Sequence, residues 1–301
     1  MIKNKNLLIV YPLLIISMVF WGGSFVWAKQ ALVYYNPIAI IFFRLLFSAI
    51  ILILFLFITK KIQIPKKKDL PYFLLLSFFE PFLYFLGETN ALTFMDSSTS
   101  SILISVIPLF TPFVAFIFLH EKIKVLNIVG ILISIFGIGF LVFDSNLTLQ
   151  VSGKGIALIS LAIIAANGYS VMIKKIDNAY SVITVTFWQN LIGMIYFLPL
   201  FFIFSYKNVF ETEFNQDAFF SILKLGFFAS SLAFIFYMYA LRNLPVSKTN
   251  VFTNFIPVFT IIISYFVLNE GIELKKIIGI CIIILGITIS QLIMWKENIN
   301  E

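Results

Sequence analysis

Long uncharged apolar runs recur along the whole 301-residue chain, and they constrain its fold more than any other feature. Seven of them reach or approach the roughly 20 residues that an α-helix needs to cross the bilayer core; they are 7–28, 97–119, 125–143, 155–173, 178–206, 249–269 and 277–295. Three similar runs differ only by embedded charges, namely 37–58 with Arg44, 70–95 with Glu80 and Glu88, and 218–241 with Lys224. We therefore expect an all-α polytopic membrane protein with ten transmembrane helices, numbered below as spans in chain order.

The composition supports a membrane protein. Hydrophobic residues make up 61% of the chain and charged residues only 12%, whereas soluble domains carry about a quarter charged residues. A membrane β-barrel is excluded, because its strands alternate polar and apolar residues over about 10 positions. The first run follows Lys3 and Lys5 as in a signal peptide, but it continues uncharged and has no small-residue cleavage pattern. It is interpreted as the first span.

The basic residues predict the orientation. With the N-terminus inside, 14 of the 21 basic residues fall in cytoplasmic segments: Lys3, Lys5, Lys60, Lys61, Lys66, Lys67, Lys68, Lys122, Lys124, Lys174, Lys175, Arg242, Lys248 and Lys296. The opposite side has 5, which are Lys29, Lys154, Lys207, Lys275 and Lys276. Short loops rich in Lys and Arg stay cytoplasmic. We expect a multi-pass protein of a bacterial-type cytoplasmic (inner) membrane with both termini cytoplasmic, and the net charge of +7 then reflects topology and not nucleic-acid binding.

An internal repeat divides the chain. The segment "IPLFTPFVAFIFLHE" at 107–121 is similar to the segment "IPVFTIIISYFVLNE" at 256–270, at an offset of 149 residues. Earlier in each half the offset is 145, as for Gly23 and Gly168, and a four-residue insertion in "KNVFETEFNQD" explains the difference. We expect two five-span units, 1–145 and 152–301. Because five is odd, the second unit enters the membrane inverted, which is typical of secondary transporters.

The chain also resembles a known family. The stretches that carry the resemblance are "FWGGSFVWAK" in the first span, "FFRLLFSAI" in the second, and the paired phrases "PLF…LHEK" and "PVF…LNEG". Together they are similar to the EamA-type transporters of the drug/metabolite transporter (DMT) superfamily. The resemblance implies a ten-helix inverted-repeat fold whose central cavity is lined by the first, third and fourth spans of each half. It also implies peripheral fifth and tenth spans, and substrates such as amino acids, often moved outward.

Polar residues inside the spans are the candidates for binding substrate. Ser101 and Ser105 in span four correspond to Asn250 and Asn254 in span nine, each pair on one helical face just before a proline. Asparagines facing lipid are costly, so this face is expected to point into the bundle. The candidate substrate-binding residues are Trp21, Ser24, Glu80, Tyr84, Glu88, Ser105, Asn167, Asn250 and Asn254.

The paired prolines and the phrase-ending carboxylates have separate predicted roles. Pro108 and Pro257 each remove a backbone hydrogen bond, and they act either as packing bends or as hinges of a gate. Glu121 and Glu270 lie at the membrane surface. We expect each to meet the positive N-terminus of the helix that follows it, as a structural feature.

Three embedded charges are the sharpest signals, because ionisable residues inside a membrane are functional candidates. Arg44 and Glu88 reach a similar depth and are predicted to form a structural ion pair. Glu80 lies near mid-membrane, next to Pro81, without a basic residue of the first half at its depth. It is interpreted either as a group that binds a cation or exchanges a proton, or as a neutral packing residue.

The leading hypothesis is therefore a secondary transporter that exports small metabolites, amino acids or related amphipathic compounds, by alternating access. The alternative is a proton-coupled multidrug or cation efflux carrier. An intramembrane enzyme is disfavoured, because the chain has one histidine, one cysteine (Cys281) and no metal or nucleophile motif. A channel is also disfavoured, because it would need a filter or charged ring and the sequence has no recognisable one. No cofactor or metal is expected; the expected partners are a small-molecule substrate, the lipid bilayer and protons, and the chain is a monomer or a homodimer.

Overall fold

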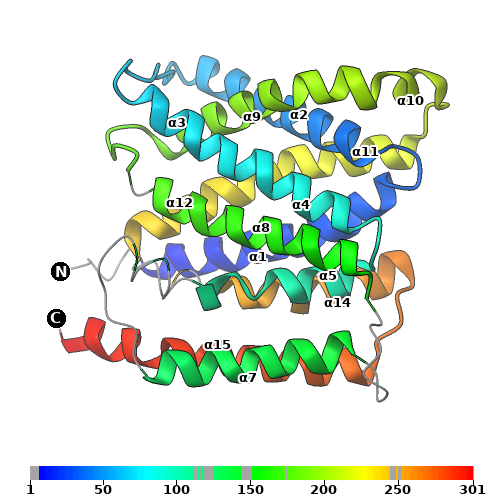
Figure 1. Ribbon diagram of the computed structural model, residues 1–301. Coiled ribbons are helices and arrows are strands. Elements are labelled where there is room, and N and C mark those ends of the chain that lie inside the picture. The colour runs from blue at the N-terminus through cyan, green and yellow to red at the C-terminus, as the bar shows by residue number, and fades with distance from the viewer. Residues whose placement is uncertain are drawn as a thin grey trace.

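The computed structural model is an all-helical bundle (Figure 1). It describes residues 7–300 except 111–113, 115–116, 118–124, 144–150, 174, 245–248 and 250–251, and it does not describe the side chains of 7, 127 and 290–300. Each of the ten predicted spans contains helix in this described part of the chain. Six helices are long and apolar enough to cross a membrane, and three shorter apolar helices accompany them. The protein is therefore a polytopic all-α membrane protein.

In the first half, the first two spans are unbroken helices and the third is composite. Span three joins a short α-helix, a π-helical segment and a second α-helix. The elements of this half are α1 (Leu7–Ala31), α2 (Pro37–Ile58), α3 (Leu70–Ser77), η1 (Phe78–Leu83), α4 (Tyr84–Ala91), α5 (Ser97–Ile104) and α7 (Val125–Val142).

The second half repeats this order. Its third span is again divided by a π-helical segment, and a short surface helix occupies the longer loop that the repeat offset predicts. The elements are α8 (Gly153–Ile173), α9 (Val182–Phe204), α10 (Tyr206–Glu211), α11 (Gln216–Lys224), η2 (Leu225–Ala233), α12 (Phe234–Asn243), η3 (Phe252–Phe255), α14 (Ile256–Leu268) and α15 (Leu274–Asn300).

Short polar residues start several of these helices. The side chains of Asn36, Asp96, Ser181 and Asn215 each accept a hydrogen bond from a backbone N–H in the first turn of α2, α5, α9 and α11, respectively. These caps satisfy N–H groups that have no partner within the helix. The starts of these four helices are thus encoded locally.

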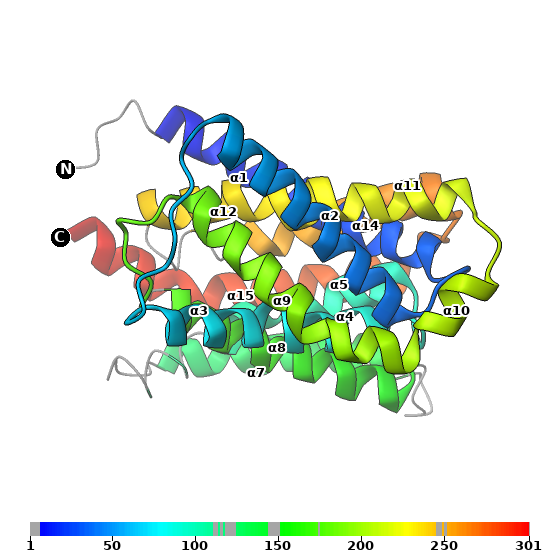
Figure 2. The same ribbon diagram turned by 90° about the horizontal axis from the view of Figure 1, so that it is seen from above.

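Helix packing follows a two-fold pattern between the halves. α1 packs on η2 and α12, and the equivalent α8 packs on η1 and α4. The equivalent helices α2 and α9 pack on each other, as do α7 and α15 (Figures 1 and 2). This pairing is what two inverted five-helix repeats produce. The start of α1 and the end of α15 lie at one end of the bundle, here called the terminal end; the opposite end is called the distal end.

Loops at the terminal end join the two halves. Gln63 accepts hydrogen bonds from the backbone N–H of Ser181 (2.7 Å) and the hydroxyl of Thr184 (3.0 Å). The Tyr180 hydroxyl donates to Asp69 at 2.7 Å. Burial raises the pKa of Tyr180, so its hydroxyl stays protonated and able to donate. These loop contacts fix how the two halves meet at this end.

Spans four and nine are interrupted at equivalent places. α5 ends at Ile104 and helix resumes at Ile107, while η3 leads directly into α14 at Ile256. Pro108 and Pro257 therefore lie in the first turn after each interruption, where a missing N–H costs little. The prolines mark a break in both spans, and their role as hinges stays a prediction.

The π-helical segment η1 fits against a glycine of α9. Glu80 has an extended backbone (φ −143°, ψ 116°) that breaks the helix, and Pro81 packs on Gly193, where an added Cβ would overlap its ring. We expect Gly193→Ala to destabilise the protein by about 1–3 kcal/mol through overpacking. Thermal unfolding in detergent measures this. Gly139→Ala is the control, because a Cβ there meets nothing within 4 Å; equal stability of the two variants would contradict the prediction.

Candidate functional site

A cavity of about 80 Å³ lies between the two halves. Residues of α1, α2, η1, α4, α5, α8, α12, η3 and α14 line it, whereas none of the described side chains of α7 and α15 does. This matches the peripheral fifth and tenth spans and the cavity-lining spans that the family resemblance implies, with Arg44 of α2 in addition. Seven residues singled out in the sequence line the cavity: Trp21, Ser24, Arg44, Glu80, Tyr84, Glu88 and Pro108.

Glu80 reaches the cavity because the helix is broken at that residue. Glu80 is 8% exposed, lies in η1 and lines the cavity together with Tyr84, one turn later. No salt bridge of the described residues involves Glu80. Its role as a group that binds a cation or exchanges a proton stays a prediction.

Arg44 is buried and held from two sides. Its Nε donates to Ser230 Oγ at 3.0 Å, and its guanidinium lies over the Phe85 ring at 3.9 Å from the ring centroid. In the described residues, no Arg44–Glu88 contact of 4.0 Å or less forms the predicted ion pair. The physical reason is that η2 presents Ser230 to Nε, while Glu88 accepts from Thr89 Oγ1 at 2.9 Å.

A polar network behind Arg44 fixes η2 against α2 and α9. Asn190 Nδ2 donates to Ser48 Oγ and to the Ser230 carbonyl, both at 2.7 Å, and the hydroxyls of Ser48 and Ser231 are 2.7 Å apart. Arg44 Nη1 is buried and has no hydrogen-bond partner in the described part of the chain. The guanidinium thus keeps unused hydrogen-bonding capacity beside the cavity.

Four aromatic side chains form another wall of the cavity. Trp21 packs on Phe234 (ring centroids 5.2 Å apart) and on Tyr237 (4.9 Å), and Tyr169 lies 6.4 Å from Phe234. Trp21 Nε1 donates to the Ala229 carbonyl at 3.3 Å. Trp21 was expected to line the cavity. The sequence reasoning missed Tyr169, Phe234 and Tyr237, because only the packing of α1 and α8 against the opposite half brings them here.

The other predicted residues lie elsewhere or bond their own helices. The hydroxyls of Ser24 and Ser105 donate to the carbonyls of Trp21 and Ile102, both at 2.7 Å. Asn167 Nδ2 donates to the carbonyls of Ile163 (2.9 Å) and Ile107 (3.4 Å), and so connects α8 to the break in span four.

Span nine contains two further predicted residues, Asn250 and Asn254. Asn254 is buried, and neither polar atom of its side chain has a hydrogen-bond partner among the residues that the structure describes. Neither Asn254 nor Pro257 lines the cavity, although their neighbours Thr253 and Ile256 do. Asn250, like Glu121, lies outside the described residues.

A protein-family model matches the chain twice, at residues 8–143 and 153–292, and its description is "EamA-like transporter family". The chain belongs to the EamA-like transporter family. It is therefore an integral membrane transporter, whose surroundings are the lipid bilayer and whose substrate is a small molecule. The geometry described above, with a cavity between two inverted halves, is consistent with this family.

The similar proteins give no narrower function. An uncharacterized transporter of Archaeoglobus fulgidus is 27% identical over 276 residues, which cover 92% of this chain and 96% of the relative. The uncharacterized transporter YoaV of Bacillus subtilis is 26% identical over 280 residues, covering 93% and 95%. A protein of known crystal structure matches with a TM-score of 0.69 at 12% identity, covering 94% of this chain and 96% of that one. This last likeness shows the fold alone.

Proposed function

We propose that the protein is a secondary transporter that exports small amphipathic metabolites, such as amino acids, across a cytoplasmic membrane by alternating access. The observation that carries this proposal is the cavity between the inverted halves, which is lined by Arg44, Glu80 and Glu88. Binding sites of inverted-repeat transporters lie near the membrane midplane at the interface of the repeats. The two repeats proposed here are 1–145 and 152–301.

The charges of the cavity fit a molecule with two charged groups. Arg44 offers unused N–H groups to a carboxylate, and guanidinium groups match carboxylates in geometry. Glu80 offers a carboxylate to an ammonium group, and Trp21 and Tyr237 provide apolar surface for the rest of the molecule. In this proposal Glu88, which already accepts from Thr89, contributes negative charge beside Arg44.

The cavity volume supports a cycle of opening and closing. About 80 Å³ holds a few water molecules at about 30 Å³ each, whereas ligand pockets usually measure about 300–1,000 Å³. Substrate therefore enters only after the halves move apart. The interruptions before Pro108 and Pro257 are the proposed flexible points of that movement, and the terminal end is the proposed cytoplasmic side.

Transport by purified protein in proteoliposomes tests the proposal. We expect saturable counter-exchange of one or more zwitterionic amino acids, and slower transport of matched amines that lack the carboxylate and of acids that lack the amine. Liposomes without protein are the control. Absence of saturable exchange for the whole amino-acid panel would contradict the proposed substrate class, and flux without saturation would indicate a channel.

A proton-coupled cation carrier is the second candidate, favoured by the aromatic wall that Trp21, Tyr169, Phe234 and Tyr237 form in the cavity with Glu80. Aromatic faces attract organic cations, and a proton competes with a cation for one carboxylate. The same panel, measured with and without a pH gradient, separates the two candidates. Preference for amines without a carboxylate, driven by the gradient, would favour the cation carrier.

A further inference from the structure

The two ends of the bundle are packed differently, although the inverted repeat relates them. At the terminal end a cavity of about 320 Å³ is lined by α8, α9, α12 and the loop after α8, including Ile173, Leu241 and Arg242. Ile173 and Leu241 are partly exposed there. If the two ends of the bundle were equally open, the equivalent residues at the distal end would be equally exposed.

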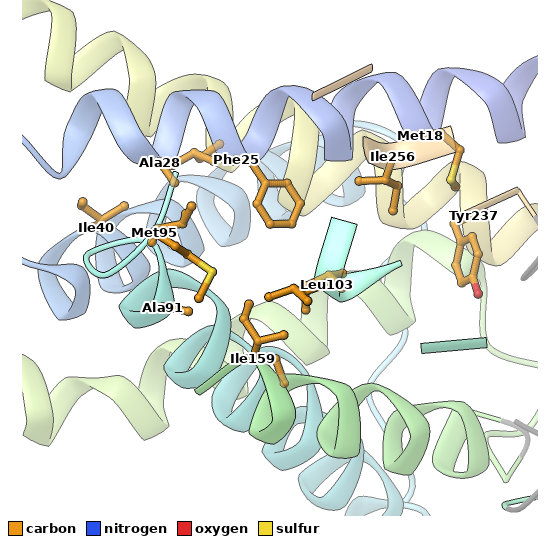
Figure 3. Close-up of a cluster of buried hydrophobic side chains, with 14 of the residues drawn as sticks. Met18, Phe25, Ala28, Ile40, Ala91, Met95, Leu103, Ile159, Tyr237 and Ile256 are labelled. Atoms are coloured by element: carbon orange, nitrogen blue, oxygen red, sulfur yellow. The ribbon is translucent and has the colours of Figure 1, made fainter. Parts of the chain in front are cut away.

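The equivalent residues at the distal end are buried. By the offsets of 145 and 149, the partly exposed Ile173 and Leu241 correspond to Ala28 and Leu92, both with 0% exposed surface. Figure 3 shows Ala28 and Ile40 gathered with Ala91 and Met95 in one buried cluster. The structure thus combines a hollow terminal end with a filled distal end.

Glu270 joins spans four and nine at the distal end. Its carboxylate accepts hydrogen bonds from the backbone N–H groups of Ser97 (3.0 Å) and Ser98 (3.2 Å) and from Ser98 Oγ (2.7 Å). The prediction that Glu270 meets the helix after it was wrong, because it caps α5. Asn269 ends α14 with a left-handed backbone (φ 54°), and Ser264 Oγ lies 3.0 Å from Ser98 Oγ, so the end of α14 lies directly against the start of α5.

Lys29 closes the same end from α1. Its ammonium donates to the carbonyls of Leu92 (2.6 Å) and Met95 (2.8 Å), in the connection between spans three and four. Ser97 Oγ also donates to the Phe25 carbonyl at 3.4 Å. Three cavity-lining spans of the first half and one of the second are therefore tied together at one point.

We propose that Lys29, Ser97, Ser98, Ser264 and Glu270 form a distal gate, and that the structure is the conformation in which this gate is closed. Opening separates the start of α5 from the end of α14 and withdraws Lys29 from its two carbonyls. This inference rests on the proposed alternating access, but it concerns access to the cavity and can be measured without any substrate.

Cysteine labelling tests the distal gate. In a Cys281→Ser background, Ser24→Cys places one thiol on the cavity wall, and a membrane-impermeant maleimide is added from the distal side. Glu270→Gln removes the charge that three donors share, so we expect Ser24→Cys to label at least about tenfold faster, since each hydrogen bond to a charged group is strong. Glu273→Gln is the matched control, because Glu273 is 62% exposed and contacts only Lys276 among the described ion pairs.

Single cysteines at Asp217 and Lys67 report which side the reagent reaches, because Asp217 lies in the first turn of α11 at the distal end and Lys67 lies in a loop at the terminal end. If Glu270→Gln leaves labelling at Ser24→Cys unchanged while Asp217→Cys is labelled, the gate is absent. If Glu273→Gln accelerated labelling at Ser24→Cys equally, the gate would also be overturned, since the effect would then come from surface charge in general.

An engineered disulfide provides a second test, which is needed if the Glu270→Gln variant fails to fold. Ser98→Cys with Ser264→Cys places two thiols where the hydroxyls are 3.0 Å apart, and oxidation is expected to stop transport until a reductant is added. Ser98→Cys alone is the control. Full transport by the oxidised pair would overturn the gate. Altered labelling at Ser24→Cys without transport of any tested compound would instead leave the gate standing and refute the proposed substrate class.

Discussion

Glu80→Gln is expected to abolish any pH dependence of transport and to weaken binding of substrates with a cationic group by at least about tenfold, while the protein still folds. Glutamine keeps the size and hydrogen-bonding capacity of the side chain but cannot release a proton or carry charge. A charged carboxylate at a helix centre costs about 2.5 kcal/mol or more, so the substitution removes a cost to folding. Initial transport rates at several pH values in proteoliposomes, together with thermal unfolding, measure both effects.

Glu88→Gln is the matched control, because Glu88 lines the same cavity and accepts one hydrogen bond from Thr89. A glutamine oxygen can still accept that bond. We expect this variant to keep the pH dependence of transport. Wild-type rates and pH dependence in Glu80→Gln would reduce Glu80 to a packing residue, and loss of pH dependence in Glu88→Gln alone would assign the titrating role to Glu88.

Arg44→Ala is expected to produce the largest loss of stability, about 3–5 kcal/mol, as when one member of a buried charged group is removed. Arg44 is the only basic residue among those lining the described cavity, and two carboxylates line it as well. The variant would leave these carboxylates without a nearby cation and would expose the Ser230 hydroxyl to an empty space. Thermal unfolding and the yield of monodisperse protein in detergent measure the loss.

Two further variants separate the charge of Arg44 from its shape. Arg44→Lys keeps the charge but loses the Nε bond to Ser230 and the planar contact with Phe85, so we expect near-normal stability and weaker transport of carboxylate-bearing substrates. Combining Arg44→Ala with Glu80→Gln and Glu88→Gln is expected to recover much of the lost stability, because the effects of substitutions at interacting residues on stability are not additive. A triple variant as unstable as Arg44→Ala would show that packing, not charge, makes Arg44 important.

The sequence predicted the spans because membrane helices depend on one local property, a long apolar run. It also found Trp21, Glu80 and Tyr84, since polar or aromatic residues inside such a run stand out individually. Tyr169 and Tyr237 could not be found in this way. They line the cavity only because α8 and α12 pack against the first half, and nothing in their own helices distinguishes them from packing residues.

Other differences arose where partners were inferred from depth in the membrane or from order along the chain. The depth of Arg44 and Glu88 suggested an ion pair, but η2 widens the turn that offers Ser230 to Arg44. Glu270 was assigned to the helix that follows it, but α5 starts closer to its carboxylate. Both contacts join the two halves, and their specific partners depend on tertiary packing, which the repeat alone does not define.

The arginine and the two glutamates of the central cavity all belong to the first half of the chain. The equivalents of Arg44, Glu80 and Glu88 in the second half are Gln189, Ala229 and Tyr237, none of which is charged at neutral pH. The duplicated units have therefore diverged into a charged half and an uncharged half. With all three groups ionised, the empty cavity would carry a net negative charge, and a bound cation would neutralise it. For a cationic substrate, membrane voltage would then act mainly on the return of the empty carrier and much less on the step that carries substrate, whereas with a zwitterionic substrate both steps would move the same net charge.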